Sequence, residues 1–218
     1  MFFRIIKVGE KMYCYIFGAL PIEAFDFEIS KEDLVIAADA GINNTHRFDI
    51  KPDYIIGDFD SLGYTPTDKN TIIHPIEKDD TDTMLAVKLG LEKGYRNFRV
   101  FGGIGGRMDH SFANIQTACY IAENNGTAIF YGNNENFTVI KNNQITFPEE
   151  NKGNISIFAL EECENVNIKG TYYELENGTL SINFPLGTSN KFNNKQATIS
   201  VEKGILLIIW ERQGENNE

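Results

Sequence analysis

Short apolar runs that alternate with helical patterns are the feature of this sequence that most restricts its fold. In the first part of the chain, compact apolar runs are followed by turn residues, which is typical of buried strands. The runs are Tyr13–Gly18, Leu34–Ala38, Tyr54–Gly57, Asn97–Gly102 and Ala128–Tyr131. Helical patterns lie at roughly residues 21–28, 40–47, 82–93 and 109–124. Strands that alternate with helices predict right-handed crossovers and a mostly parallel, Rossmann-like sheet.

The helical pattern after Asp109 also predicts which of its side chains face the sheet. Apolar residues recur at helical spacing, and Gly126 is expected to end the segment. The side chains expected to point inward are Phe112, Ile115, Cys119 and Ala122.

The pattern changes past about residue 135, where no long helical stripe remains. Short strand signals follow at Phe137–Ile140, Ile155–Ala159, Val166–Ile168, Leu180–Phe184, Ala197–Val201 and Ile205–Trp210. They predict a small antiparallel, all-β sandwich. The expected division is therefore an α/β domain over residues 12–135 and a sandwich domain over residues 136–212. Residues 1–11 precede the first strand and are interpreted as an N-terminal extension.

The charge and the cysteines restrict the partners and the compartment. The 218 residues carry a formal net charge of -11, which argues against broad nucleic-acid binding because such binding needs a basic face. An acidic protein repels a polyphosphate unless Mg²⁺ lies between them, whereas it attracts a cationic co-substrate. The three cysteines form no disulfide framework or zinc pattern, and no apolar run approaches about 20 residues. We therefore expect a cytoplasmic protein without a membrane span.

Four polar clusters lie where open α/β sheets bind ligands, after predicted strands. They are Asp39–Gly41, Gly57–Ser61, Asp79–Asp82 and Gly102–His110. Asp58 and Asp60 are expected on one side of an extended chain, because strand side chains alternate with period two. Two adjacent carboxylates repel each other unless a cation lies between them, and Mg²⁺ prefers oxygen ligands. The alternative is a loop whose Asp residues bond to local N–H groups, but the neighbouring acidic clusters favour a metal site.

The Asp79–Asp82 cluster has both a structural and a functional interpretation. Thr81 is a good N-cap, and acidic residues in the first turn of a helix complement its dipole. Three acidic residues in four positions would nevertheless repel one another there. Asp82 is therefore favoured as a functional carboxylate, whereas Lys78 either meets a phosphate or pairs with Asp79.

Gly102–His110 combines a glycine-rich turn with charged side chains. Four glycines after a strand present backbone N–H groups to phosphate oxygens just before a helix N-terminus. Arg107 adds a permanently charged fork for phosphate. The spacing is neither that of the Lys-containing phosphate loop nor G-x-G-x-x-G. For His110, the roles of base, ligand, substrate contact and structural residue all stay open.

Taken in order, these blocks resemble thiamine pyrophosphokinase of the bacterial type. The matching segments are Asp39–Gly41, Lys51–Ser61, Lys78–Asp82, Gly102–Ile115 and Leu186–Asn190. The resemblance implies transfer of the pyrophosphoryl group of ATP to the hydroxyl of thiamine, which gives thiamine diphosphate and AMP. It also implies an α/β catalytic, nucleotide-binding domain followed by a thiamine-binding β-sandwich. The implied assembly is a homodimer with thiamine bound near the interface.

The resemblance further implies a role for individual residues. Those that look like the Mg²⁺ and pyrophosphate-handling carboxylates are Asp58, Asp60 and Asp82, which with Asp109 are the catalytic candidates. Those expected from the resemblance to contact ATP or thiamine are Asp39, Arg107, Asn114, Ser189 and Asn190. The remaining candidate binding residues, which lie within the matching segments, are Lys78, Thr81 and His110. One of the Asp residues is expected to accept the proton of the attacking hydroxyl. The residues do not indicate which one.

Three other functions fit parts of the pattern. A pyrophosphokinase with another acceptor, such as a hydroxymethylpterin, would use the same carboxylates, although the Leu186–Asn190 turn favours thiamine. A metal-dependent phosphohydrolase also suits Asp-rich strand ends, but only three histidines argue against a His-rich dinuclear site. A non-catalytic nucleotide sensor would gain little from so many carboxylates. Pyrophosphoryl transfer to thiamine is therefore the leading hypothesis.

Overall fold

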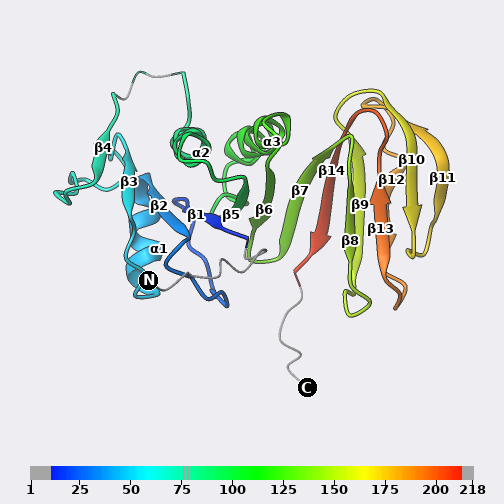
Figure 1. The fold of residues 1–218 in the computed structure, drawn as a ribbon, viewed down its shortest axis with the longest axis horizontal. Helices are drawn as coiled ribbons and strands as arrows, with labels where there is room; N and C mark the ends of the chain where they lie inside the picture. Colours follow the sequence, from blue (N-terminus) through cyan, green and yellow to red (C-terminus); the bar gives the residue numbers. More distant parts are fainter. Residues whose placement is uncertain (1–10, 76, 78, 213–218) are drawn as a thin grey trace, which may run out of the picture.

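The computed structural model describes residues 11–75, 77 and 79–212, and strands alternate with helices in its first part (Figure 1). The strands are β1 (Tyr13–Phe17), β2 (Leu34–Ala38), β3 (Tyr54–Gly57), β4 (Thr71–Ile73), β5 (Asn97–Phe101) and β6 (Thr127–Tyr131). The helices are the 3-10 turn η1 (Asp39–Gly41), α1 (Ile42–Arg47), α2 (Asp82–Glu92) and α3 (Met108–Glu123). The strands are parallel and lie in the order β6-β5-β1-β2-β3-β4.

The second part of the chain consists of antiparallel strands. They are β7 (Glu135–Lys141), β8 (Gln144–Phe147), β9 (Asn154–Ala159), β10 (Cys163–Lys169), β11 (Leu175–Leu180), β12 (Gly187–Lys191), β13 (Ala197–Ser200) and β14 (Ile205–Glu211). Four of them extend the first sheet beyond β6, in the order β7-β14-β9-β12. The other four form a second sheet, β11-β10-β13-β8. A hydrophobic core that includes Ile157, Ile199 and Leu206 packs between these antiparallel strands. The predicted fold, an α/β part followed by a β-sandwich, is confirmed.

Alternation along the parallel strands builds a core on each face of the sheet. Ile16 and Ile36 belong to the larger core, to which α2 and α3 contribute. Tyr15 and Phe17 point to the opposite face, because successive side chains in a strand alternate. Ile42 of α1 packs on that opposite face against neighbouring strands. Helices therefore cover both faces of the parallel part.

The helix predicted over residues 21–28 does not form, because the segment serves the sheet instead. Phe25 and Phe27 recur with a spacing of two and insert into an aromatic cluster with Phe17, Phe101 and Tyr131. Their ring centroids lie 5.1 Å from Phe101 and Tyr131, respectively. Partial burial of two aromatic rings outweighs local helical preference here.

The predicted inward stripe of α3 is wrong at its first residue. Phe112 is 59% exposed, whereas Asn114, Ala118 and Ile121 are among the residues that α3 buries. The buried face is therefore displaced toward smaller and polar residues, which let the helix approach the strands closely. Ile115 and the later members of the stripe are partly buried at the margin of the core.

Two features of the sandwich also differ from the prediction. The strand predicted at Leu180–Phe184 ends at Leu180, and Ile182 and Phe184 are exposed. Strands β8 and β12 were not predicted, because both are short and partly polar. The same holds for β4 at the edge of the parallel part. The extension predicted at residues 1–11 lies, apart from Lys11, outside the described residues. Within that described part, no helix is long and apolar enough to span a membrane.

Candidate active site

Asp39 follows β2 directly and begins η1. Its backbone is left-handed, with φ of 49°, and its side chain is 8% exposed. A Cβ on Gly57 of β3 would lie 3.0 Å from Asp39 Cα, so glycine allows this close approach. A Cβ on Gly41 would collide with the carbonyl group of Phe17, so η1 is held against the end of β1. The Oδ1 atom of Asp39 is buried and has no hydrogen-bond partner within the described residues.

Asp58 and Asp60 follow β3, but not in the extended conformation that the sequence predicted. Phe59 between them has φ of 63°, and its ring is buried against α1 and its neighbouring strands. Burial of this ring turns the chain at Phe59, between the two carboxylates. Asp58 Oδ1 accepts a hydrogen bond from Asp60 N at 3.3 Å, and Ser61 donates one to Asp60 Oδ1 at 3.0 Å.

Asp39, Asp58 and Asp60 form one group of carboxylates. One oxygen from each lies within 4.8 Å of the others. Three negative charges at this separation repel one another, so a cation between them stabilises the arrangement. Carboxylate oxygens are the ligands that Mg²⁺ prefers, and the unpaired oxygen of Asp39 leaves one ligand atom ready. The donor set therefore fits a divalent cation.

The group contains Asp39 in place of the predicted Asp82. Asp82 is the first residue of α2, and Thr81 caps that helix by accepting a hydrogen bond from Met84 N at 3.2 Å. The predicted structural role of Thr81 is thus present. Asp80 pairs with Lys88 at 2.6 Å, so it already has a structural partner. Lys78 lies outside the described residues.

The glycine-rich segment lies at the topological switch point of the sheet, between β5 and β1. Gly102 has φ of +67°, and a Cβ there would lie 2.8 Å from the carbonyl oxygen of Gly18. Leu20 N donates a hydrogen bond to Gly102 O at 3.1 Å. Asn44 of α1 fixes the same segment by donating to Gly18 O and Leu20 O, each at 2.8 Å. No local pattern predicts this role of Asn44, because its partners are backbone atoms far along the chain.

Arg107 and Asp109 face each other at the start of α3. Arg107 donates from Nε at 3.1 Å and from Nη2 at 2.5 Å, so the pair is bidentate. The hydrogen bonds from Arg107 lower the pKa of Asp109, and those to Asp109 raise the pKa of Arg107. Both side chains are largely exposed, which leaves the other guanidinium donors accessible. His110 is exposed too, and its backbone N donates to Asp109 Oδ1 at 3.0 Å.

Two polar side chains of α3 hold the glycine-rich loop. Asn114 is 6% exposed and donates to Gly103 O at 2.7 Å. Ser111, which the sequence interpretation missed, accepts a hydrogen bond from Gly105 N at 3.2 Å. Both residues bond to the backbone of the loop, so Asn114 holds the loop in position.

Ser189 and Asn190 lie on β12, at the far edge of the large sheet. A register shift between Gly187 and Asn190 marks a β-bulge, and Ser189 within it is exposed with φ of 58°. Asn190 is 3% exposed; its Oδ1 accepts from Tyr173 N at 2.9 Å and its Nδ2 donates to Tyr173 O at 2.7 Å. Of these two residues, both predicted to contact thiamine, Ser189 is therefore exposed to solvent, whereas Asn190 holds the backbone at Tyr173.

The β12 edge and the carboxylate group lie far apart in one chain. Eight strand spacings separate β12 from β3 in the sheet order. At about 4.8 Å each, they amount to roughly 38 Å. Figure 1 shows the two strands in the two different halves of the molecule. A single thiamine molecule is too short to contact both places.

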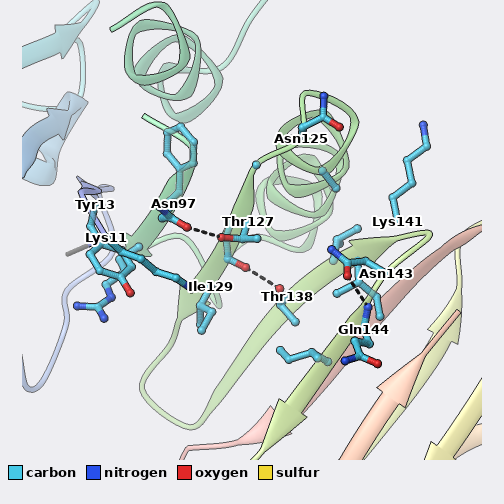
Figure 2. Close-up of a pocket in the computed structure, with 18 of the residues that line it drawn as sticks. Lys11, Tyr13, Asn97, Asn125, Thr127, Ile129, Thr138, Lys141, Asn143 and Gln144 are labelled. Carbon is cyan, nitrogen blue, oxygen red and sulfur yellow. Dashed lines mark hydrogen bonds between the residues drawn. The ribbon is translucent and has the colours of Figure 1, made fainter. Parts of the chain in front are cut away.

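A cavity of about 380 Å³ lies at the opposite, amino-terminal ends of the parallel strands (Figure 2). It is lined by none of the predicted site residues. Several of its polar groups already bond to one another: Thr127 donates to Asn97 Oδ1 at 3.2 Å, and Thr138 donates to Ala128 O at 2.6 Å. The carboxyl edge with its three carboxylates is therefore the better candidate for catalysis.

Two family models match this chain in the order of its two halves. The thiamin pyrophosphokinase catalytic domain matches residues 25–131, and the vitamin B1 binding domain of thiamin pyrophosphokinase matches residues 142–206. The chain belongs to the thiamin pyrophosphokinase family. Membership of this family confirms the predicted function and enzyme class, a thiamine diphosphokinase, and disfavours the alternatives with another acceptor or with hydrolysis.

Individual members of the thiamin pyrophosphokinase family are similar over most of their length. The chain is 29% identical to thiamine pyrophosphokinase of Bacillus subtilis (strain 168) over 186 residues, which cover 81% of this chain and 86% of the relative. A crystal structure of the Bacillus subtilis enzyme has a TM-score of 0.79 at 25% identity, covering 94% of this chain and 100% of that one. Thiamin pyrophosphokinase from Candida albicans has a TM-score of 0.74 at 17% identity, covering 92% and 90%, and shares the fold.

Proposed function

We propose that this chain transfers the pyrophosphoryl group of ATP to thiamine at the carboxyl edge of β2, β3 and β5. The observation that carries the proposal is the convergence of Asp39, Asp58 and Asp60, with an unpaired oxygen on Asp39. The proposed division of labour gives the nucleotide to residues 12–135 and thiamine to residues 136–212. It agrees in order with the two matched family models.

In this proposal, Asp39, Asp58 and Asp60 hold Mg²⁺. Bound Mg²⁺ supplies neutralisation of the phosphate charge, which an acidic protein needs in order to bind ATP. Asp82 stays part of the proposed site, because it begins α2 and α2 packs against β1, β2 and β3. In the proposed group of Mg²⁺ ligands, Asp39 replaces Asp82.

The glycine-rich loop and Arg107 bind and orient the phosphates. Backbone N–H groups near the start of α3 face anions favourably, and Arg107 contributes the donors that Asp109 leaves unused. One carboxylate accepts the proton of the thiamine hydroxyl while the oxygen of that hydroxyl bonds to the β-phosphorus of ATP and AMP leaves. Asp109 is a weak base for this step, because Arg107 lowers its pKa. Its proposed role is therefore to orient Arg107.

Thiamine is supplied to the carboxylates by a second copy of the chain. The roughly 38 Å between β12 and β3 exceeds the length of thiamine, so Ser189 of one copy must serve the carboxylates of the other. We therefore propose a homodimer whose two sites are each composite. The positive charge of thiamine suits the acidic balance of both copies.

Mixed dimers test this arrangement directly. Asp60→Asn removes a carboxylate and Ser189→Arg repels cationic thiamine, so each variant alone is expected to be inactive. Random mixing makes half of the dimers mixed, each with one intact site, so about one quarter of the wild-type activity should return. No recovery, with mixed dimers verified by mass, would place both residues in the site of a single chain.

The reaction itself is tested by its products. Protein incubated with ATP, Mg²⁺ and thiamine should release AMP and thiamine diphosphate in equal amounts. ADP release, or turnover without thiamine, would contradict the proposal. The variant Asp39→Asn should abolish the Mg²⁺-dependent rise in melting temperature as well as turnover, which separates metal binding from catalysis.

We also propose a cytoplasmic location, without membrane or nucleic-acid partners. The support is the acidic net charge and the three free thiols, of which Cys14 and Cys163 are buried. Burial raises the pKa of Cys119 to about 11, so this thiol is not reactive at neutral pH. Fractionation of native cells, with the protein recovered in the membrane pellet, would contradict this location.

A further inference from the structure

A second cavity, of about 290 Å³, lies under the carboxyl ends of β5 and β6. Its wall is the loop between Ile22 and Phe27, and its floor comes from β6, β7 and β14. Ile129 lines both this cavity and the one in Figure 2, so both open on the same face of β6. That face is opposite α3, because Ala128 and Phe130 alternate with Ile129 and belong to the core beneath α3.

The floor of the cavity is a row of three side chains on neighbouring strands. Tyr131 lies opposite Asn136 in the β6–β7 pair, and Asn136 lies opposite Trp210 in the β7–β14 pair. Directly opposed residues of antiparallel strands share a face of the sheet, so the amide lies between two aromatic rings. Both rings are fixed from behind: Tyr131 stacks on Phe101 at 4.8 Å, and Trp210 packs on Phe147 at 5.0 Å.

Asn136 is a buried amide that the protein does not satisfy. It is 6% exposed, and its Oδ1 has no hydrogen-bond partner anywhere in the described ranges. Thr138, two residues along the same strand and equally buried, donates to Ala128 O at 2.6 Å. Since buried polar groups are usually paired, the contrast marks Asn136 as a group whose partner comes from elsewhere.

We propose that this cavity binds a planar nitrogen heterocycle through the amide of Asn136. A carboxamide offers one acceptor and one donor side by side, which matches a ring nitrogen next to an amino group. The flanking Tyr131 and Trp210 suit an aromatic ring. A volume of about 290 Å³ lies at the small end of ligand pockets, which favours one or two rings over a whole nucleotide. The shared chemistry is the 4-aminopyrimidine edge found in both adenine and thiamine.

The cavity is distinct from the proposed catalytic site. Four strand spacings separate β7 from β2, the strand that ends at Asp39. They correspond to about 19 Å, which is too far for the base of an ATP whose terminal phosphates lie at the carboxylates. The inference therefore does not depend on the proposed catalytic residues.

The chain contains its own reporter of this site. Trp210 is the single tryptophan of the sequence, and it lines the cavity. Adenosine and thiamine, each added in the absence of ATP and Mg²⁺, are expected to quench or shift its fluorescence in a saturable way. The two probes distinguish a nucleoside from thiamine as the source of the ring. N6,N6-dimethyladenosine, which lacks the amino donor, is the matched negative probe.

Two variants on β7 separate ligand binding from structural effects. Asn136→Leu should weaken heterocycle binding at least about tenfold, because both hydrogen bonds are lost. It should also raise the melting temperature of the free protein, since an unpaired buried amide becomes an apolar group. Thr138→Val is the control: it removes a paired hydroxyl, so it should lower the melting temperature and leave heterocycle binding unchanged.

A third variant separates this inference from the proposed function. Asp60→Asn should abolish turnover while the Trp210 response to the heterocycle persists. The inference is overturned if neither probe changes Trp210 fluorescence, or if Asn136→Leu binds as tightly as the wild type. A fall in melting temperature of Asn136→Leu, similar to that of Thr138→Val, would also overturn it, because the amide would then have an internal partner.

Discussion

The carboxyl edge of the parallel strands and the β12 edge of the sandwich both bury polar side chains, but these side chains differ in their hydrogen bonding. At the carboxyl edge, Asp39 is 8% exposed, and its Oδ1 has no partner in the portion of the chain that the structure describes. At the β12 edge, Asn190 is 3% exposed, and both ends of its amide are hydrogen-bonded. An unpaired buried group is costly unless a ligand completes it. We therefore propose ligand contact for Asp39 and a positioning role for Asn190.

The sharpest test of this comparison is the loss of a carboxylate. Asp60→Asn is expected to reduce turnover at least about 100-fold, because it removes one charge that neutralises and orients the pyrophosphate site. The fold should persist, since Asp60 is exposed. Steady-state kinetics with circular dichroism measure both effects. Asp68→Asn, another exposed acid in the connection after β3, is the control and should retain activity. Unfolding of Asp60→Asn would indicate a structural role instead.

The second test compares the stability of the two buried groups. Asn190→Ala should lower the free energy of unfolding by about 2–4 kcal/mol, because the backbone groups of Tyr173 lose their partner. Asp39→Asn should leave that free energy unchanged or raise it, because a buried repulsive charge disappears. Urea unfolding of both variants provides the measurement. Equal destabilisation by both variants would contradict the view that Asn190 stabilises the fold and Asp39 does not.

A third, smaller effect is expected at the bulge of β12. Ser189→Ala should raise the KM for thiamine several-fold while the KM for ATP stays nearly constant, because Ser189 is exposed on the proposed thiamine side. Initial rates with each substrate varied in turn measure the split. Thr146→Ala, an exposed hydroxyl on β8, is the matched control. Equal changes in both constants would contradict the assignment of this edge to thiamine.

The smallest effect concerns the exposed pair at the start of α3. Arg107→Gln should raise the pKa of Asp109 toward its ordinary value, because the hydrogen bonds of Arg107 hold it down. The lowered pKa means that the pair stabilises the fold above the ordinary Asp pKa of about 3.9 and loses this contribution as pH falls through the lowered value. Carboxyl chemical shifts measured against pH follow the titration. An unchanged pKa would show that the pair does not persist in solution.

Much of the fold followed from local sequence patterns. The strands β2 and β3 were predicted with their observed bounds, because compact apolar runs end there in glycine and aspartate. The helix predicted at residues 21–28 is wrong, because Phe25 and Phe27 pack against side chains of strands far along the chain. The sandwich strands β8 and β12 lack an apolar run of their own and pair only because their neighbours are already in place.

The candidate site divides in the same way. The sequence by itself determined that strands end in carboxylates and that a glycine-rich loop precedes α3, because these depend on neighbouring residues. Only the tertiary structure decided which carboxylates meet. Burial of Phe59 turns the chain after β3, and Gly57 lets Asp39 approach, so Asp39 joins the group in place of Asp82. Convergence of this kind depends on packing between separate strands, which no local pattern records.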